Sequence, residues 1–324
     1  MRVTMTDVAA AAGVSPMTVS YTYNRPARVS ADTRERVLRV ARELGYGGPD
    51  PRARALRHQR SGSLGFVLGE HLTYAFEDPQ ATRFLAGVAA VCVEEGLGLT
   101  MIPVTGGEND AARVREAAVD GYIVWTTGDD DPVLHALADR PAVVLGGPAL
   151  PGAGLVTIDD RAAARAAGLA AFRGSRSPAV VSFPMGRDRT PAVLYGPDPD
   201  AAPFPVTRNR LAGYRDAITE LGGDWSAVPV LVLARNDAAE ARDRFRELGH
   251  PDAVAAMGDT VALALPHAGT ITGWDDTDGA AAAGLTTIRQ SLRDQGEACA
   301  RQLVTGRLRT EKAPWTLVER ASTA

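Results

Sequence analysis

The sequence predicts two parts of different fold class: an N-terminal all-α helix-turn-helix domain over residues 1–47 and a two-lobed α/β domain with parallel sheets over residues 63–324. Two short helical segments joined by a glycine open the chain. An Arg-rich segment with Gly and Pro at its start, residues 48–62, has the composition of a linker. From Leu64 onward, short apolar runs alternate with amphipathic Ala-rich stretches, a pattern typical of parallel strands covered by helices.

The first two helices are bounded by residues that favour helix ends. Thr6 and Ser15 stand at N-cap positions, where a hydroxyl can accept hydrogen bonds from the free amides of the first turn. Pro16 follows at the first helical position, where its fixed φ fits and its missing N–H costs nothing. Gly13 marks the turn, so we expect one helix on each side of it.

A third helix is predicted after Ser30, with Gly45 as the C′ residue that ends it. Three helices of this size form only a marginal core, because so few large apolar residues are available. The expected apolar face of the third helix consists of Val37, Val40, Ala41 and Leu44.

Charge is distributed unevenly along the chain. Residues 1–60 contain 11 Arg and 5 acidic residues, a net charge of +6, whereas residues 61–324 carry a net charge of −10. A basic end on an acidic body is typical of a domain that binds phosphate groups of nucleic acid. DNA is therefore the first partner to consider for the N-terminal domain.

The body of the chain contains nine strand candidates and six helix candidates. Their alternation predicts two lobes, each with a parallel sheet. The strands are expected at residues 64–68, 97–104, 121–125, 142–145, 156–158, 179–183, 228–233, 253–256 and 270–273, and the helices at 81–95, 111–118, 161–172, 210–221, 238–248 and 292–304.

Three segments carry a resemblance to a known family: TMTDVAAAAGVSPMTVSYTYN, RVSADTRERVLRVARELGY and ARALRHQRSGSLGFV. Together they resemble the N-terminus of the lac repressor (LacI/GalR) family of bacterial transcription regulators, almost without gaps to about residue 65. The resemblance implies a homodimer that binds palindromic operator DNA, most simply a repressor whose DNA affinity is changed by a small-molecule effector. A dimer also follows from geometry, because one small helix-turn-helix reads only a half-site.

The resemblance assigns DNA contacts residue by residue. It places base-edge contacts on the second helix, phosphate contacts around it, and a hinge helix in the linker whose leucine, Leu56, inserts into the minor groove. A hinge helix of two turns is unstable in water, so its folding would be coupled to DNA. The implied DNA-binding residues are Pro16, Met17 and Tyr21 for bases, Thr18, Ser20, Asn24, Ser30, Thr33 and Arg34 for phosphates, and Ala53, Arg54 and Leu56 in the hinge.

The resemblance continues more loosely as a periplasmic-binding-protein-like effector domain, in which ligands bind between the lobes at the carboxyl ends of strands. Arg210 and Asp275 match the usual effector-binding positions. Charged groups among aromatic rings suit a sugar or polyol, and equally a nucleobase or a small acid. The full set of expected effector-binding residues is Tyr74, Phe76, Asp78, Trp125, Asp159, Arg210, Trp274 and Asp275.

Two departures from the family pattern leave the effector open. Gly258 stands where a polar residue usually precedes Asp259. The segment 259–270 is shorter than usual by about one helix, and the span 161–178 is also expected to be shortened. An effector-independent or activating regulator with a degenerate cleft is one alternative, and a sugar-binding carrier protein is another. An enzyme using Asp159 and Asp275 as a carboxylate pair is a weaker third, because it leaves residues 1–60 unexplained.

Several site types find no support in the sequence. Cys92 and Cys299 do not indicate a disulfide framework and suit a reducing cytosol. The only lysine is Lys312, so no P-loop is present, and the five His are scattered without metal-ligand spacing. No apolar run has membrane-spanning length and no secretory segment is evident. We therefore expect no enzyme activity, cofactor or metal, no membrane association, and a cytoplasmic, nucleoid-associated bacterial protein.

Overall fold

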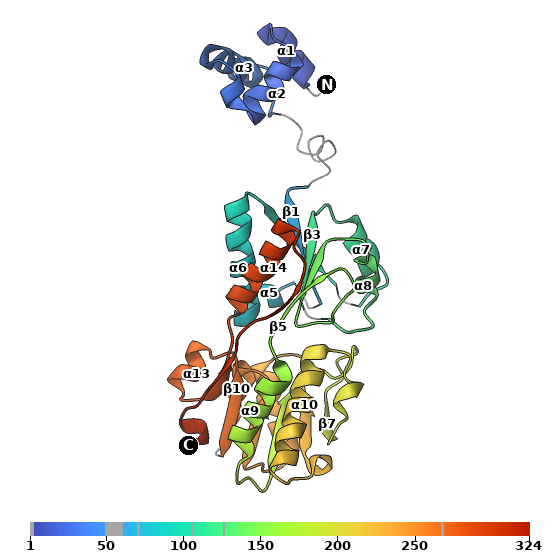
Figure 1. Ribbon diagram of the computed structural model, residues 1–324, viewed down its shortest axis with the longest axis vertical. Helices are drawn as coiled ribbons and strands as arrows, with labels where there is room; N and C mark the ends of the chain where they lie inside the picture. Colours follow the sequence, from blue (N-terminus) through green and yellow to red (C-terminus); the bar gives the residue numbers. More distant parts are fainter. Residues whose placement is uncertain (1–2, 49–60, 70–71, 105, 126, 267–268) are drawn as a thin grey trace. The chain divides into compact units, whose positions relative to one another are not determined.

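The computed structural model describes residues 3–48, 61–69, 72–104, 106–125, 127–266 and 269–324 (Figure 1). The chain divides into two compact units, Met1–Gly62 and Ser63–Ala324. The predicted hinge residues Ala53, Arg54 and Leu56 lie outside the described residues.

The first unit consists of α1 (Met5–Ala12), α2 (Pro16–Asn24), a 3-10 turn at Pro26–Arg28 and α3 (Ala31–Glu43). Gly13 ends α1 with φ 64°, and Gly45 has φ 71° just after α3. The helices enclose a core of small apolar side chains that includes no aromatic ring at its buried centre: Val8, Ala9, Ala12, Val19, Val37, Val40 and Ala41.

Two details of this unit differ from the sequence-based expectation. Thr6 lies inside α1, and the N-cap is Thr4, whose hydroxyl accepts from the amide of Asp7 while the Asp7 carboxylate accepts from the amide of Thr4. This reciprocal capping box satisfies two free amides, and the helix therefore starts two residues earlier than expected. The prediction of Leu44 in the apolar face was also wrong, because Leu44 is 39% exposed at the C-cap of α3.

The N-lobe of the second unit contains a six-stranded sheet in the order β12-β5-β4-β3-β1-β2, in which every pairing is parallel. Helices α6 and α14 pack against each other beside this sheet (Figure 1). The strands are β1 (Ser63–Leu68), β2 (Gly98–Pro103), β3 (Gly121–Trp125), β4 (Ala142–Leu145), β5 (Gly154–Thr157) and β12 (Thr310–Lys312), and the helices are α5 (Tyr74–Glu77), α6 (Pro79–Glu95), α7 (Asp110–Glu116), α8 (Pro132–Ala136) and α14 (Leu292–Thr305).

The C-lobe contains a seven-stranded sheet in the order β13-β11-β10-β9-β6-β8-β7, parallel except where β7 and β13 join it. The strands are β6 (Pro178–Ser182), β7 (Ala192–Tyr195), β8 (Pro229–Val232), β9 (Ala253–Ala256), β10 (Thr270–Trp274), β11 (Thr286–Arg289) and β13 (Thr316–Val318). The helices are α9 (Asp160–Phe172), α10 (Pro205–Glu220), α11 (Ala238–Arg244), α12 (Asp259–Ala262) and α13 (Asp278–Ala282), with short 3-10 turns at Pro199–Ala201, Trp225–Ala227, Phe245–Leu248 and Ala321–Thr323.

Glycines allow the closest helix pairs. A Cβ added at Gly87 of α6 would lie 2.0 Å from the carbonyl oxygen of Arg293 in α14, and one at Gly296 would lie 2.2 Å from the carbonyl oxygen of Phe84. Helices α9 and α10 meet similarly at Gly213, where a Cβ would lie 2.3 Å from a backbone oxygen. Only residues without a side chain permit this approach.

The predicted fold class is confirmed, and all nine strand candidates coincide with strands to within a few residues. The sequence pattern missed short elements, among them β7, β12, β13, α5 and α13, each of three to five residues and too short to show a period. The chain passes between the lobes after β5, after β11 and after β12, so that both lobes contain segments distant in sequence. Within the described part of the chain, no helix combines the length and apolar character needed to cross a membrane.

Candidate functional site

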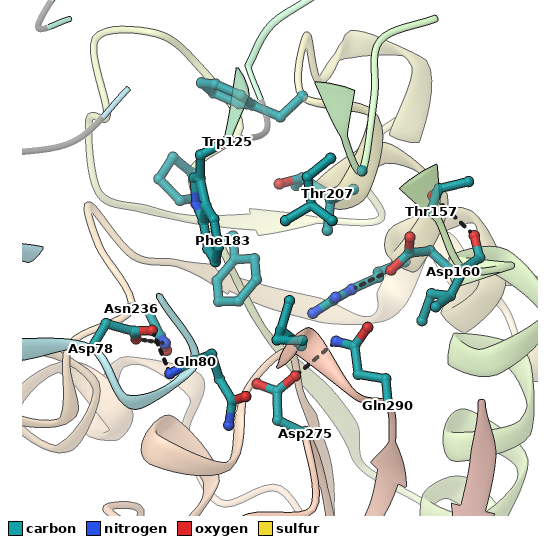
Figure 2. Close-up of a pocket in the computed structure, with 18 of the residues that line it drawn as sticks. Asp78, Gln80, Trp125, Thr157, Asp160, Phe183, Thr207, Asn236, Asp275 and Gln290 are labelled. Carbon is teal, nitrogen blue, oxygen red and sulfur yellow. Dashed lines mark hydrogen bonds and ion pairs between the residues drawn. The ribbon is translucent and has the colours of Figure 1, made fainter. Parts of the chain in front are cut away.

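A cavity of about 160 Å³ lies between the two lobes of the second unit, and we call it the interlobe cavity. Its lining side chains follow the carboxyl ends of parallel strands in both sheets, the position where open α/β sheets usually bind ligands. Figure 2 shows Asp78, Gln80 and Asn236 on one side of the cavity, and Thr157 and Asp160 on the opposite side.

Arg210, on α10, is held at the cavity by hydrogen bonds and aromatic contacts. Its Nε donates to Asp160 Oδ1 over 2.9 Å and its Nη1 donates to the carbonyl oxygen of Met257 over 2.8 Å. The guanidinium carbon lies 3.7 Å from the ring centroid of Trp274, close enough for a cation–π contact. Because Arg210 is only 6% exposed, these contacts leave it one orientation, toward the cavity.

The carboxylate that pairs with Arg210 belongs to Asp160, not to its neighbour Asp159. Asp159 caps α9 by accepting from the amide of Ala162, lies 3.5 Å from Lys312 Nζ, and does not line the interlobe cavity. Asp160 is buried, and burial raises its pKa while the charge of Arg210 opposes the rise. The sequence pattern could not separate the two because adjacent carboxylates at a helix start look alike.

Asp275 enters the cavity from the turn after β10. Its Oδ1 accepts from Gln290 Nε2 over 2.8 Å, and Gln290 in turn accepts from Gln295 Nε2 over 3.0 Å. Removal from water raises the pKa of Asp275 to about 7, although Arg210 and the Gln290 hydrogen bond favour the charged form. Asp275 is therefore a carboxyl group that changes charge near neutral pH.

A third polar group of the cavity, centred on Asp78, contains a hydrogen bond between the two lobes. Asp78 caps α6 by accepting from the amides of Gln80 and Ala81, and it also accepts from Asn236 Nδ2, in the other lobe, over 3.2 Å. Two atoms beside it, Gln80 Nε2 and Asn236 Oδ1, are buried without a hydrogen-bond partner in the structure. Buried polar groups of this kind are normally satisfied, so they are suited to meet a ligand or a water.

Gly258 has a direct steric relation to this site. A Cβ at Gly258 would lie 3.1 Å from Asn236 Oδ1, so a larger residue would press on the Asn236 amide. The space that a side chain at position 258 would fill is therefore occupied by the side-chain amide of Asn236, from the loop after β8.

The predicted effector-binding residues separate into two groups in the structure. Tyr74, Asp78, Trp125, Arg210 and Asp275 line the cavity. The other three do not line the cavity. Phe76 is 67% exposed, Asp159 lies outside the cavity, and Trp274 is buried beneath Arg210. Sequence reasoning missed other lining residues, among them Gln80, Thr157, Asp160, Phe183, Thr207, Asn236 and Gln290.

Ion pairs also connect the two lobes. Arg208 Nη1 lies 2.6 Å from Asp129 Oδ2, and Arg187 lies 3.3 Å from both Asp130 and Asp131. The acidic residues belong to the N-lobe loop after β3, and the arginines belong to the C-lobe. These contacts favour a closed arrangement of the lobes.

The helix-turn-helix unit presents its predicted DNA contacts on the surface. Met17 is 61% exposed although it is apolar, and Pro16, Asn24, Ser30 and Arg34 are also exposed. Thr18, Ser20, Tyr21 and Thr33 are half-buried, with Thr18 hydrogen-bonded to the N-cap Ser15 and Thr33 to the N-cap Ser30. An exposed methionine on the first turn of the second helix is free to make apolar contact.

No group of His, Cys, Asp and Glu side chains in the described ranges is arranged to hold a metal ion. Both cysteines are buried thiols without a disulfide.

Comparisons with known proteins agree with this architecture. The sequence profile of "Bacterial regulatory proteins, lacI family" matches residues 4–48. The chain is 38% identical to the HTH-type transcriptional regulator Rv3575c of Mycobacterium tuberculosis, over 91% of this chain and 88% of that protein. Among solved structures, a LacI-family transcriptional regulator from Corynebacterium glutamicum superposes with a TM-score of 0.75 at 27% identity, covering 99% of this chain and 98% of the other.

A second solved structure carries a ligand. The complex of the transcriptional regulator CelR with cellobiose superposes with a TM-score of 0.67 at 25% identity, covering 99% of this chain and all of the other. The helix-turn-helix unit, the two lobes and these relatives agree, and the chain belongs to the lacI family of bacterial regulatory proteins.

Proposed function

We propose that this protein is a transcription repressor whose affinity for operator DNA changes when a small-molecule effector, a sugar or related polyol, binds in the interlobe cavity. The observation that carries the proposal is the combination, in one chain, of an exposed recognition helix with a cavity between two lobes that is lined by both polar and aromatic side chains. A regulator of this kind acts on the chromosome, so the proposal also places it in the bacterial cytoplasm at the nucleoid.

The polar groups of the cavity favour a ligand with several hydroxyl groups. Asp78 and Asp275 can accept hydrogen bonds, Arg210 and Gln80 can donate them, and the Trp125 ring offers an apolar face. A hydroxyl both donates and accepts, so one polyol can satisfy both kinds of group. The CelR complex with cellobiose supports this class, because that regulator shares the fold.

The DNA side of the proposal requires a homodimer and a palindromic site. One unit of three helices contacts only a half-site, and two units related by a two-fold axis contact both halves. We assign Pro16, Met17 and Tyr21 to base edges, and we assign Leu56 of the hinge to the minor groove. Binding of effector would change the angle between the lobes and separate the hinges.

Footprinting tests the DNA side. DNA upstream of the operon that encodes the protein should show a protected palindrome, and Met17→Ala should weaken protection about tenfold, the equivalent of roughly 1.4 kcal/mol. Leu44→Ala is the matched control, because Leu44 is also an exposed apolar residue but lies on α3. Equal losses for both variants, or no protected palindrome, would defeat the proposal.

The hinge requires its own comparison. Leu56→Ala should weaken operator binding far more than binding to random DNA at one salt concentration, because insertion of the leucine depends on a specific, bendable step. Equal losses on both DNAs would remove the proposed role of Leu56.

A thermal-shift screen with sugars, polyols and nucleosides tests the effector side. A ligand that binds only the folded protein raises its unfolding temperature by mass action. A hit that changes operator affinity supports the proposal, and hits that stabilise the protein but leave operator binding unchanged contradict it. The short α12, Asp259–Ala262, keeps a regulator without an effector as the second candidate, and that candidate is favoured if no compound stabilises the protein.

A further inference from the structure

The turn that carries Asp275 into the cavity has an unusual backbone. Asp275 has φ 103° and Asp276 has φ 49°, so two consecutive residues with side chains adopt conformations that favour glycine. The surrounding structure must hold such a turn, because the chain would otherwise relax to a more populated region.

The carboxylate of Asp276 ties this turn to two arginine side chains of the C-lobe. Its Oδ1 accepts from Arg320 Nη2 over 2.6 Å, and its Oδ2 accepts from Arg289 Nε over 2.5 Å. The Asp276 side chain is 10% exposed, the Arg320 side chain 18%, and the Arg289 side chain 59%. Arg320 is therefore the better-shielded partner, and its ion pair is the less screened of the two.

Arg320 is itself fixed to the C-lobe sheet. Its Nη1 donates to the carbonyl oxygen of Leu285 over 2.8 Å, and its backbone amide donates to Thr286 Oγ1 over 2.8 Å. Two residues later, the Ser322 hydroxyl donates to the carbonyl oxygen of Ile271 in β10 over 2.6 Å. The segment around Arg320 thus spans β10 and β11, on whose carboxyl ends the turn is built.

We propose that Arg320 is a positioning residue of the interlobe cavity, which holds Asp276 and thereby keeps Asp275 pointing at the ligand. Arg320 does not line the cavity and lies 45 positions after Asp275 in the chain. Its effect passes through the backbone of the turn, in which the amides of Asp275, Asp276 and Thr277 donate to the Ile288 carbonyl, Thr287 Oγ1 and Asp259 Oδ2, and the Asp275 side chain is held by Gln290.

The ionisation of Asp275 offers a measure of its position without any ligand. Arg210 from α10, Asp259 from α12 and Asp78 from the N-lobe face this carboxyl, and removal from water raises its pKa to about 7. If the turn relaxes, the carboxyl reaches water and its pKa falls toward the ordinary value of about 4. If Arg320 acted only through its charge, its loss would raise the pKa of Asp275 instead.

The experiment follows the indole N–H signal of Trp274 in full-length protein labelled with ¹⁵N-tryptophan, titrated between about pH 4 and 9. The chain has four tryptophans, and loss of one signal in Trp274→Phe assigns the reporter next to Asp275. Arg320→Gln removes the ion pair but keeps a donor for the Leu285 carbonyl, so it should fold. In Arg320→Gln, the pH at the inflection of the Trp274 titration should be lower than in wild type by about one unit or more. Arg320→Lys restores the charge and should recover most of this difference.

Arg309→Gln is the matched control, since it breaks an exposed arginine–carboxylate pair with Glu311 in the N-lobe, and its inflection should match wild type. An unchanged or raised inflection in Arg320→Gln overturns the proposal, as does a wild-type protein without an inflection near neutral pH. The inference rests on the proposed effector cavity, but this titration uses no effector. A lowered inflection with no ligand found would uphold the role of Arg320 in placing Asp275 and count only against the proposed function.

Discussion

Asp160→Asn offers the sharpest test of how the cavity is built. The Asp160 and Arg210 side chains are 4% and 7% exposed, so the substitution leaves a buried guanidinium whose remaining contacts are the Met257 carbonyl and the Phe183 and Trp274 rings. Removing one member of a buried pair costs about 3–5 kcal/mol. At about 2–4 °C per kcal/mol for a domain of this size, the melting temperature of the second unit should fall by roughly 6–20 °C.

Asp159→Asn is the control for this measurement. Asp159 is adjacent in sequence, but its pair with Lys312 is formed by side chains 48% and 68% exposed. Exposed pairs contribute about 0–1 kcal/mol, so the melting temperature should change by no more than about 4 °C. Calorimetry at pH 7 measures both variants and distinguishes a change in the second unit from one in the small helical unit.

A further variant tests the coupling. Asp160→Leu combined with Arg210→Met removes both charges, and it should cost less stability than Asp160→Asn alone because no buried charge stays unpaired. If Asp159→Asn destabilises as much as Asp160→Asn, or if the double variant is the worst of all, the buried pair does not organise the cavity as described.

Three other predictions concern the lobes. Arg208→Gln breaks the ion pair with Asp129 between the lobes, so small-angle scattering should give the variant a larger radius of gyration than wild type at low salt. The radii of variant and wild type should converge at about 1 M salt, where charges are screened. Equal radii at low salt would show that the pair does not favour closure. Gly87→Ala drives a Cβ into the backbone of α14 and should lower the free energy of unfolding in urea by about 3 kcal/mol, whereas a cost below about 0.5 kcal/mol would mean that the helices can separate without loss. Burial raises the pKa of Cys92 and of Cys299, so the reactive thiolate is scarce at pH 8 and a thiol reagent should label both only after unfolding; rapid labelling of native protein would contradict their burial.

The sequence was most informative where a residue type has one structural use. Gly13, Ser15 and Pro16 define the helix-turn-helix, because a left-handed turn, a cap and a first-turn proline leave few alternatives. Arg210 and Asp275 were also placed at the cavity correctly, since both lie where the family resemblance and the strand-end rule agree.

Other features depend on tertiary contacts that no local pattern encodes. Whether Asp159 or Asp160 turns inward is decided by the position of α10, which brings Arg210 to Asp160. Phe76 and Trp274 were both expected at the cavity as aromatic residues beside polar ones, yet one faces outward and the other is buried under a guanidinium. The DNA roles of residues 16–34 and of the hinge stay predictions.

The passage of α14 into the N-lobe affects how the protein can fold during synthesis. The first five N-lobe strands are complete at residue 157, but Leu292, Cys299 and Ala300 of α14, which fill the same core, follow only in residues 292–305. At about 5–20 residues per second, the ribosome needs roughly 7–27 s to make the intervening 134 residues. During that time the apolar face of α6 has no helix to cover it, while the helix-turn-helix unit has already left the ribosome. The DNA-binding unit can therefore fold well before the lobe that regulates it, and the nascent N-lobe presents an apolar surface to chaperones in the interval.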